Sequence, residues 1–150
     1  GIAIAITLLS VLPGNVEPYQ RVDAYGARLT GGVAVDAGAT VNTKGAWSAV
    51  GTITQPAEGM VIGLSNQQTS GRSTFNFLMD VQVAFGGGSA NILSDYALES
   101  STNDDLMYPQ TTPFIPCHIP SGGTINVRAS CSGTVTPSGR TFDVAAYLVS

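Results

Sequence analysis

His118, the only histidine of the chain, is the first candidate for chemistry, because imidazole is the side chain that enzymes use most often as a general base. It stands within "IPCHIP", directly after Cys117. A catalytic base needs a nucleophile within reach and an acid that orients it, and the sequence has no GxSxG motif. Cys117 cannot serve, because neighbouring side chains of a strand point to opposite faces. We therefore expect a structural or surface role for His118 and no enzymatic activity.

The acidic residues are the remaining candidates for catalysis or metal binding. The 10 acids leave open a carboxylate pair for glycoside hydrolysis. No aromatic-rich groove accompanies such a pair, since Trp47 is the only tryptophan and lies in a segment with a core-like strand pattern. Asn103, Asp104 and Asp105 could offer oxygen atoms to Ca²⁺, but the spaced DxDxDG pattern of a calcium loop is missing. We expect neither a metal nor a cofactor.

Cys117 and Cys131 are the only cysteines, and their spacing matches neither a metal site nor a redox CxxC motif. A domain of this length does not need a covalent bridge. We expect free thiols in the core, with a disulfide between the two left open.

The charge content narrows the possible partners. Charged residues make up 11% of the chain, against about 25% in an average soluble domain, and they are replaced by small polar residues. This composition is typical of tightly turned β structure with a surface covered by neighbours, or of a stable low-charge extracellular sandwich. The net charge is −4 and the basic residues are spread singly, so we expect no nucleic-acid binding.

Period-two alternation predicts strands along most of the sequence. In residues 72–85 the odd positions from Phe75 to Phe85 are expected to face a core, and alternation also predicts strands at 124–131 and 141–148. The segment 90–101 could form a helix, although strand or loop fits it equally well. Shorter strands are expected at Gly32 to Asp36, Ala39 to Thr43, Ala46 to Thr54, Gly59 to Asn66, Asn91 to Leu98 and Thr112 to Ile119. The sequence predicts an all-β fold, an antiparallel jelly-roll-like β-sandwich over residues 21–150 that carries an extended N-terminal arm, residues 1–20.

The N-terminal arm is too apolar on both faces to be an edge strand left in water. It is covered either by its own domain or by another subunit through strand addition or arm exchange. Its apolar run is shorter than the roughly 20 residues of a membrane helix, and it lacks the basic leader of a signal peptide. Because the chain begins at glycine, we expect a mature cytoplasmic product with an intact N-terminus and no membrane partner. The residues expected to bind a partner are Ile2, Ile4, Ile6, Leu8 and Leu9.

A second candidate for partner binding is the polar excursion at residues 100–114, because loops of this length are commonly functional. Its apolar tip consists of Leu106, Met107 and Tyr108.

Four segments, taken in order, resemble a jelly-roll module that recurs in virion proteins of tailed bacteriophages. They read "KGAWSAVGTITQPAEGMVIGL", "FNFLMDVQVAFGGGSANIL", "TPFIPCHIPSGGTINVRASC" and "RTFDVAAYLV", and they fill most of residues 44–149. The matching positions are Asp80, Gly86 to Ser89, Ile119 to Gly122, Ile125 to Arg128 and Asp143 to Leu148.

The resemblance implies an accessory structural protein of a virion, assembled in the host cytoplasm. The first expectation is a capsid cement or decoration protein that binds the major capsid protein or another virion protein, as a homotrimer. The alternative is a tail or tail-fibre module that binds a receptor or carbohydrate. A secreted lectin-like domain is disfavoured because no signal segment is present.

Overall fold

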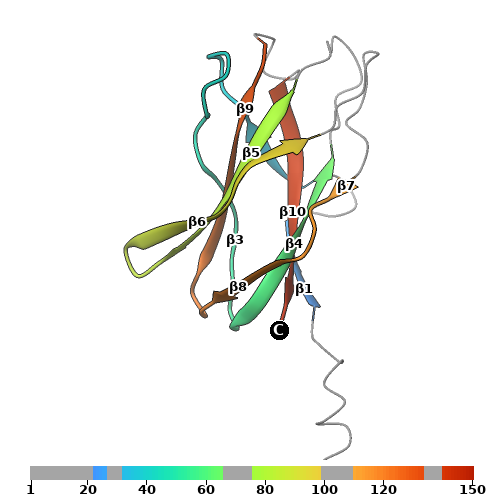
Figure 1. Cartoon of the computed structure of the whole chain (residues 1–150). Coiled ribbons are helices and arrows are strands. Elements are labelled where there is room, and N and C mark those ends of the chain that lie inside the picture. The colour runs from blue at the N-terminus through green and yellow to red at the C-terminus, as the bar shows by residue number, and fades with distance from the viewer. Residues whose placement is uncertain (1–21, 27–31, 66–75, 99–109, 134–139) are drawn as a thin grey trace, which may run out of the picture.

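Two antiparallel sheets packed face to face form the protein (Figure 1). The computed structural model describes residues 22–26, 32–65, 76–98, 110–133 and 140–150. The strands are β1 (Val22–Tyr25), β2 (Val33–Asp36), β3 (Ser48–Thr52), β4 (Ala57–Ser65), β5 (Phe77–Phe85), β6 (Gly88–Leu98), β7 (Gln110–Thr111), β8 (Ile115–Ile119), β9 (Thr124–Cys131) and β10 (Thr141–Val149).

The strand order is that of a jelly roll. In the first sheet, named sheet A, β10 and β4 lie side by side; β1 and β2 pair with β10, and β7 and β8 pair with β4. In the second sheet, named sheet B, the order is β3-β9-β5-β6. The orders β2-β10-β4-β8 and β3-β9-β5-β6 correspond to the two sheets of an eight-stranded jelly roll. The predicted all-β sandwich is confirmed.

The core lies between the sheets, where alternate side chains of the long strands are buried, most regularly in the first halves of β9 and β10. In β10, Phe142, Val144 and Leu148 are buried, and in β9 the buried positions begin with Ile125 and Val127. Phe77 of sheet B meets Phe142 of sheet A edge to face, with ring centroids 5.7 Å apart. Offset contacts of this kind add to the stability that comes from burial alone.

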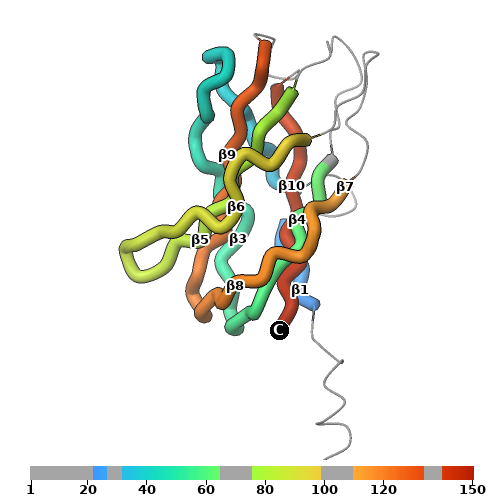
Figure 2. The backbone as a smooth tube through the Cα atoms, viewed as in Figure 1, coloured from blue at the N-terminus to red at the C-terminus, as the bar shows by residue number. Residues whose placement is uncertain are grey.

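The longest hairpin, β5 and β6, extends sideways from the body of the sandwich (Figure 2). Its turn consists of Gly86 and Gly87, with φ of 61° and 83°, the left-handed values that a tight two-residue hairpin turn requires. Along the hairpin the register shifts between Met79 and Gln82, so that Asp95 of β6 adopts a φ of 54°. This irregularity brings the Asp95 backbone toward the outer face of β5.

Several local predictions were wrong. Residues 39–43 form turns rather than a strand, and Asn42 has a φ of 56°. By contrast, the strand expected at Asn91 to Leu98 is confirmed as part of β6, and the helical alternative for this segment does not form over residues 90–98. Phe85 was expected to be buried but is 53% exposed, because the hairpin carries it past the end of the core.

The predicted boundary between the arm and the sandwich, at residues 20 and 21, lies outside the described residues. The predicted arm, residues 1–20, lies outside the described residues, and β1 begins at Val22. In the described ranges, no helix is long and apolar enough to cross a membrane.

Candidate interaction surfaces

A cluster of four charged side chains lies on the outer face of sheet B, centred on Asp80 of β5. Asp80 is only 3% exposed, although it points away from the core. Its carboxylate accepts hydrogen bonds from Lys44 Nζ at 2.5 Å, from Arg128 Nε of β9 at 2.9 Å and from the backbone N–H of Asp95 at 2.9 Å. Lys44 also pairs with the Asp95 carboxylate at 2.8 Å. The cluster is therefore electrically neutral within itself.

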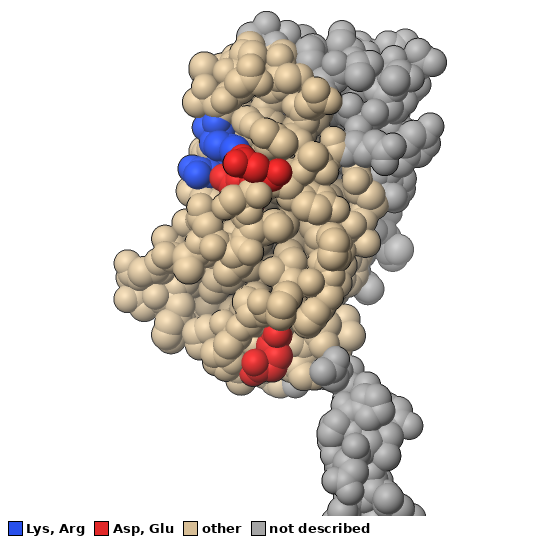
Figure 3. Space-filling view, viewed as in Figure 1, with Lys and Arg blue, Asp and Glu red and all other residues tan. Residues whose placement is uncertain are grey.

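The electrostatics of the cluster favour the ionised form of Asp80. Burial opposes ionisation, but hydrogen bonds from Lys44, the Asp95 backbone and Arg128 outweigh it and hold the pKa of Asp80 below its ordinary value. The Arg128 guanidinium lies over the ring of Trp47, 4.4 Å from its centroid. Trp47 therefore stands on the outer face, half-buried, and the prediction that it lies in a core-like strand was wrong. Figure 3 shows basic and acidic atoms adjoining in one patch on a surface that is mostly uncharged in this view.

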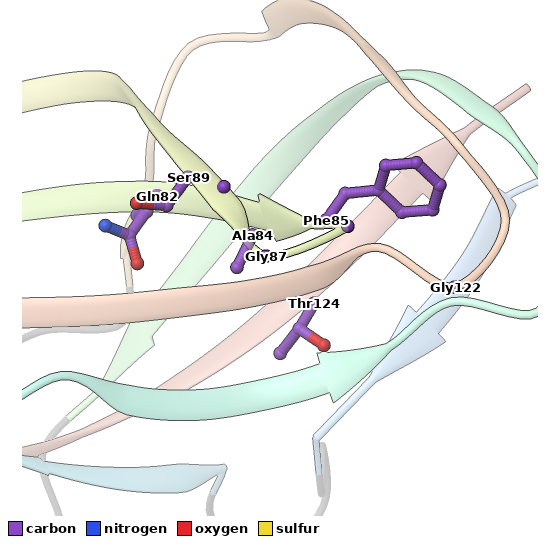
Figure 4. A pocket seen from close by; sticks show the side chains of 9 residues that line it. Gln82, Ala84, Phe85, Gly87, Ser89, Gly122 and Thr124 are labelled. Carbon is purple, nitrogen blue, oxygen red and sulfur yellow. The ribbon is translucent and has the colours of Figure 1, made fainter.

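The rest of this outer face is covered with amides and hydroxyls. Asn126 Nδ2 donates to Gln82 Oε1 at 3.1 Å, and the hydroxyls of Thr52 and Thr124 are 2.8 Å apart. Toward the β5–β6 turn the surface is hollowed, with a volume of about 480 Å³ (Figure 4). The Phe85 ring points away from Gln82, so it provides no stacking platform there. The lining residues are Gln82, Ala84, Phe85, Gly86, Gly87, Gly88, Ser89, Gly122 and Thr124.

The outer face of sheet A has the opposite character. Residues paired across strands share a face, so the register places Val22 and Val149 together, and Tyr147 between its partners on β1 and β4. Val22 is 59% exposed and Phe114 is 51% exposed. We name this surface the apolar face; it comprises Val22, Ala24, Val61, Phe114, Pro116, Tyr147 and Val149, whereas Ala145 on the same side of β10 is buried.

Two glycines let aromatic rings lie flat on the apolar face. A Cβ at Gly59 of β4 would overlap the ring of Phe114, and one at Gly63 would come within 2.9 Å of the Tyr147 ring. The rings therefore cover backbone and present their other side outward. Large exposed apolar patches are typical of surfaces that contact other proteins.

Polar residues bound the apolar face at its two ends. At one end, His118 Nδ1 is 2.9 Å from Glu58 Oε1, and both side chains are well exposed. At the other end, Asp143 of β10 lies between Ala34 of β2 and Ser65 of β4 in the register. Partial burial raises the pKa of Asp143.

No disulfide joins Cys117 and Cys131. Cys131 is buried, and Cys117 is half-buried. Burial, with the negative charge of Glu58, raises the pKa of Cys117, so little thiolate is present at neutral pH. This arrangement is that of structural cysteines rather than reactive ones.

The described side chains form no recognisable metal centre: among them, no group of three or more His, Cys, Asp or Glu could hold an ion. The calcium candidates Asn103, Asp104 and Asp105 lie outside the described residues. The same is true of all the predicted partner-binding residues, Ile2, Ile4, Ile6, Leu8, Leu9, Leu106, Met107 and Tyr108.

Sequence reasoning did not find the Asp80 cluster or the apolar face. The signal for the cluster was an acid and an arginine at outward positions of two strands, but only the pairing of Asp80 with Arg128 shows that they meet. The signal for the apolar face was alanine, tyrosine and valine at the outward positions of β10, where polar residues would be expected on a sheet that faces water.

Comparisons with known proteins give little further guidance. No protein-family description matches the chain, and no curated protein matches it. Among solved structures, the chain is similar to one described as infectious bursal disease virus, Gt strain, with a TM-score of 0.34 and 14% identity. The similarity covers 87% of this chain and 33% of the other, so the chain spans about a third of that protein. A TM-score of this size carries no conclusion about function.

Proposed function

We propose that the protein is a non-enzymatic structural component of a virus particle. Within that class, we propose a capsid cement or decoration protein of a tailed bacteriophage, which binds the lattice of the major capsid protein and stabilises the head. The observation that carries the proposal is the apolar face of sheet A, exposed on a jelly roll whose other outer face is polar.

The contrast between the two outer faces supports attachment through one side. Asp80, Lys44, Arg128 and Asp95 satisfy one another on sheet B, so that face needs no charged partner. Sheet A instead exposes about half of Val22 and of Phe114, and burying the remainder would be worth roughly 0.7–1.5 kcal/mol per side chain before ordering costs. Modest contacts of this size suffice for a lattice protein, because repeated copies or linked subunits multiply the affinity.

The fold alone does not decide between function classes, since jelly rolls occur in viral capsid domains and in lectins. The deciding experiment is the copy number of the chain in purified virions, measured by quantitative mass spectrometry against the major capsid protein. Copies on the order of hundreds per particle are expected for a head protein that binds repeatedly on the lattice. A handful of copies would indicate a tail component, and absence from virions would refute the proposal.

The hollow beside the β5–β6 turn favours one second candidate, a receptor- or carbohydrate-binding module of a tail or tail fibre. Its amide and hydroxyl groups, from Gln82, Ser89 and Thr124, are of the kind that bind a neutral sugar. Glycan-array binding that is lost in Gln82→Ala, together with a low copy number, would support this candidate over the first. Retained lattice binding by Gln82→Ala, without glycan binding by the wild type, would exclude it.

A further inference from the structure

Asp143 differs from every other acid in the described part of the chain. Asp36 pairs with Arg140, Glu58 with His118, and Asp80 and Asp95 with Lys44. Asp23 also has a partner. Asp143 makes no hydrogen bond and no ion pair within the described ranges, although it is partly buried.

The surroundings of Asp143 are poor in compensating charge. Ala34 flanks it on β2, and Ala145 follows it on the same face of β10. The described cations are already engaged elsewhere: Lys44 and Arg128 with Asp80, and Arg140 with Asp36 in the neighbouring register pair. A carboxylate that has lost part of its hydration without gaining a partner is destabilising, so a cation brought to it from outside would find a favourable position.

We propose that the apolar face is occupied by a segment of another virion protein that presents a lysine or arginine to Asp143. This inference rests on the proposed function and specifies the chemistry of the partner. Its apolar side chains would pack on Val61, Tyr147 and Val149, and its cation would pair with Asp143. Along an extended strand Asp143 and Val149 are about 20 Å apart, so the cation lies at one end of the segment and the apolar residues toward the other.

The position of Asp143 makes such a pair favourable. Part of the desolvation that ion pairing requires is already present in the free protein, so the partner's cation meets a carboxylate with less hydration to lose. A segment without the cation would instead bury the Asp143 carboxylate without a compensating charge, which disfavours binding. Asp143 would therefore discriminate between partners as well as contribute to affinity.

The test is co-sedimentation of the purified protein with head particles from which the protein has been removed. Asp143→Asn keeps the shape and removes the charge, and we expect it to bind at least about tenfold more weakly, the usual result when one member of a buried charged pair is lost. Asp143→Lys should abolish binding. Glu58→Gln is the matched control, because it makes the same charge change at the opposite end of the apolar face, and its binding should stay within about twofold of the wild type, as for a rim charge.

A stability measurement separates docking from folding. The raised pKa of Asp143 means that its charge destabilises the free folded protein, so Asp143→Asn should unfold at the same temperature as the wild type or higher. Lower stability of Asp143→Asn, reproduced by Arg21→Gln, Arg28→Gln or Arg72→Gln, would show an internal partner for Asp143 and overturn the inference. These three arginines lie outside the described residues.

The two proposals fail in different ways. If the wild type does not sediment with the particles, the proposed function is wrong, and the inference falls with it. If the wild type binds and Asp143→Asn binds equally well, only the inference is wrong. Weak binding by Val61→Asp, together with normal binding by Asp143→Asn, would place the partner on the apolar face without a cation at Asp143, which also overturns it.

Discussion

Removing the Asp80 carboxylate should destabilise the fold more than removing any exposed carboxylate. Asp80→Ala deletes the acceptor of three hydrogen bonds from Lys44, Arg128 and the Asp95 backbone. Bonds to a charged group contribute about 1.5–3 kcal/mol each, but the full sum does not apply here. The side chains of Lys44 and Arg128 are 20% and 30% exposed and can recover water, and Lys44 keeps its contact with Asp95. We expect a net loss of about 3 kcal/mol, at the lower end of the range for a broken buried pair.

The pH dependence of this stabilisation follows from the lowered pKa of Asp80. The pKa in the folded protein is below the ordinary 3.8, so the contribution is fully present at pH values above the unfolded pKa. It is lost as the pH falls through the folded value. The difference in unfolding free energy between the wild type and Asp80→Asn should therefore be constant near neutral pH and shrink below about pH 4.

Urea denaturation at neutral pH measures this loss, followed by circular dichroism and by the fluorescence of Trp47, which lies under Arg128 in the same cluster. The matched control is Asp36→Ala, which breaks the ion pair between Asp36 and Arg140. The Asp36 side chain is 48% exposed, so this substitution should lower the free energy of unfolding by less than about 1 kcal/mol. If Asp80→Ala costs no more than Asp36→Ala, the cluster does not stabilise the fold as reasoned.

Three further outcomes are expected. The double variant Cys117→Ala, Cys131→Ala should fold and lose about 1–3 kcal/mol in urea denaturation, since no disulfide joins the two residues; failure to fold would show a structural bridge. Gly59→Ala should destabilise the protein by at least about 1 kcal/mol in the same assay, because its Cβ would displace the Phe114 ring and approach the Ile115 carbonyl at 2.9 Å. Deletion of residues 1–12 should leave the thermal transition nearly intact and sharply reduce particle binding or trimer formation; a truncated protein that unfolds would instead make the arm part of the core.

The long strands could be predicted from the sequence because their period is sustained. In β9 and β10, alternate residues such as Val127 and Phe142 mark the inner face without reference to any neighbour. The short strands β1 and β7 could not be found this way, since two to four residues carry no periodic signal. Phe85 continues the alternation of β5, which predicts a buried side chain. Its exposure could not be predicted, because the sequence does not show where the opposite sheet ends.

The interaction surfaces depend on registers that a single sequence does not contain. Asp80 and Arg128 lie far apart in sequence and meet only because β5 pairs with β9. The role of Asp143 also depends on the register. In the sequence it is one polar residue of an alternating strand, whereas the fold places its charge beside Ala34 without a described partner. The apolar face becomes visible only when β1, β10 and β4 are placed side by side.

Val22 and Val149 pair on the apolar face, and this position affects where foreign sequence can be attached without blocking that face. Foreign sequence placed directly after Val149 would start at the border of the apolar face and compete for the space of a bound partner (Figure 1). The turn at Gly86 and Gly87 extends away from the body, and a Cβ at either glycine would meet no atom within 4 Å. Exposed turns of this kind are where insertions are tolerated. Cargo displayed from the hairpin turn would project away from the sandwich while leaving sheet A free to bind.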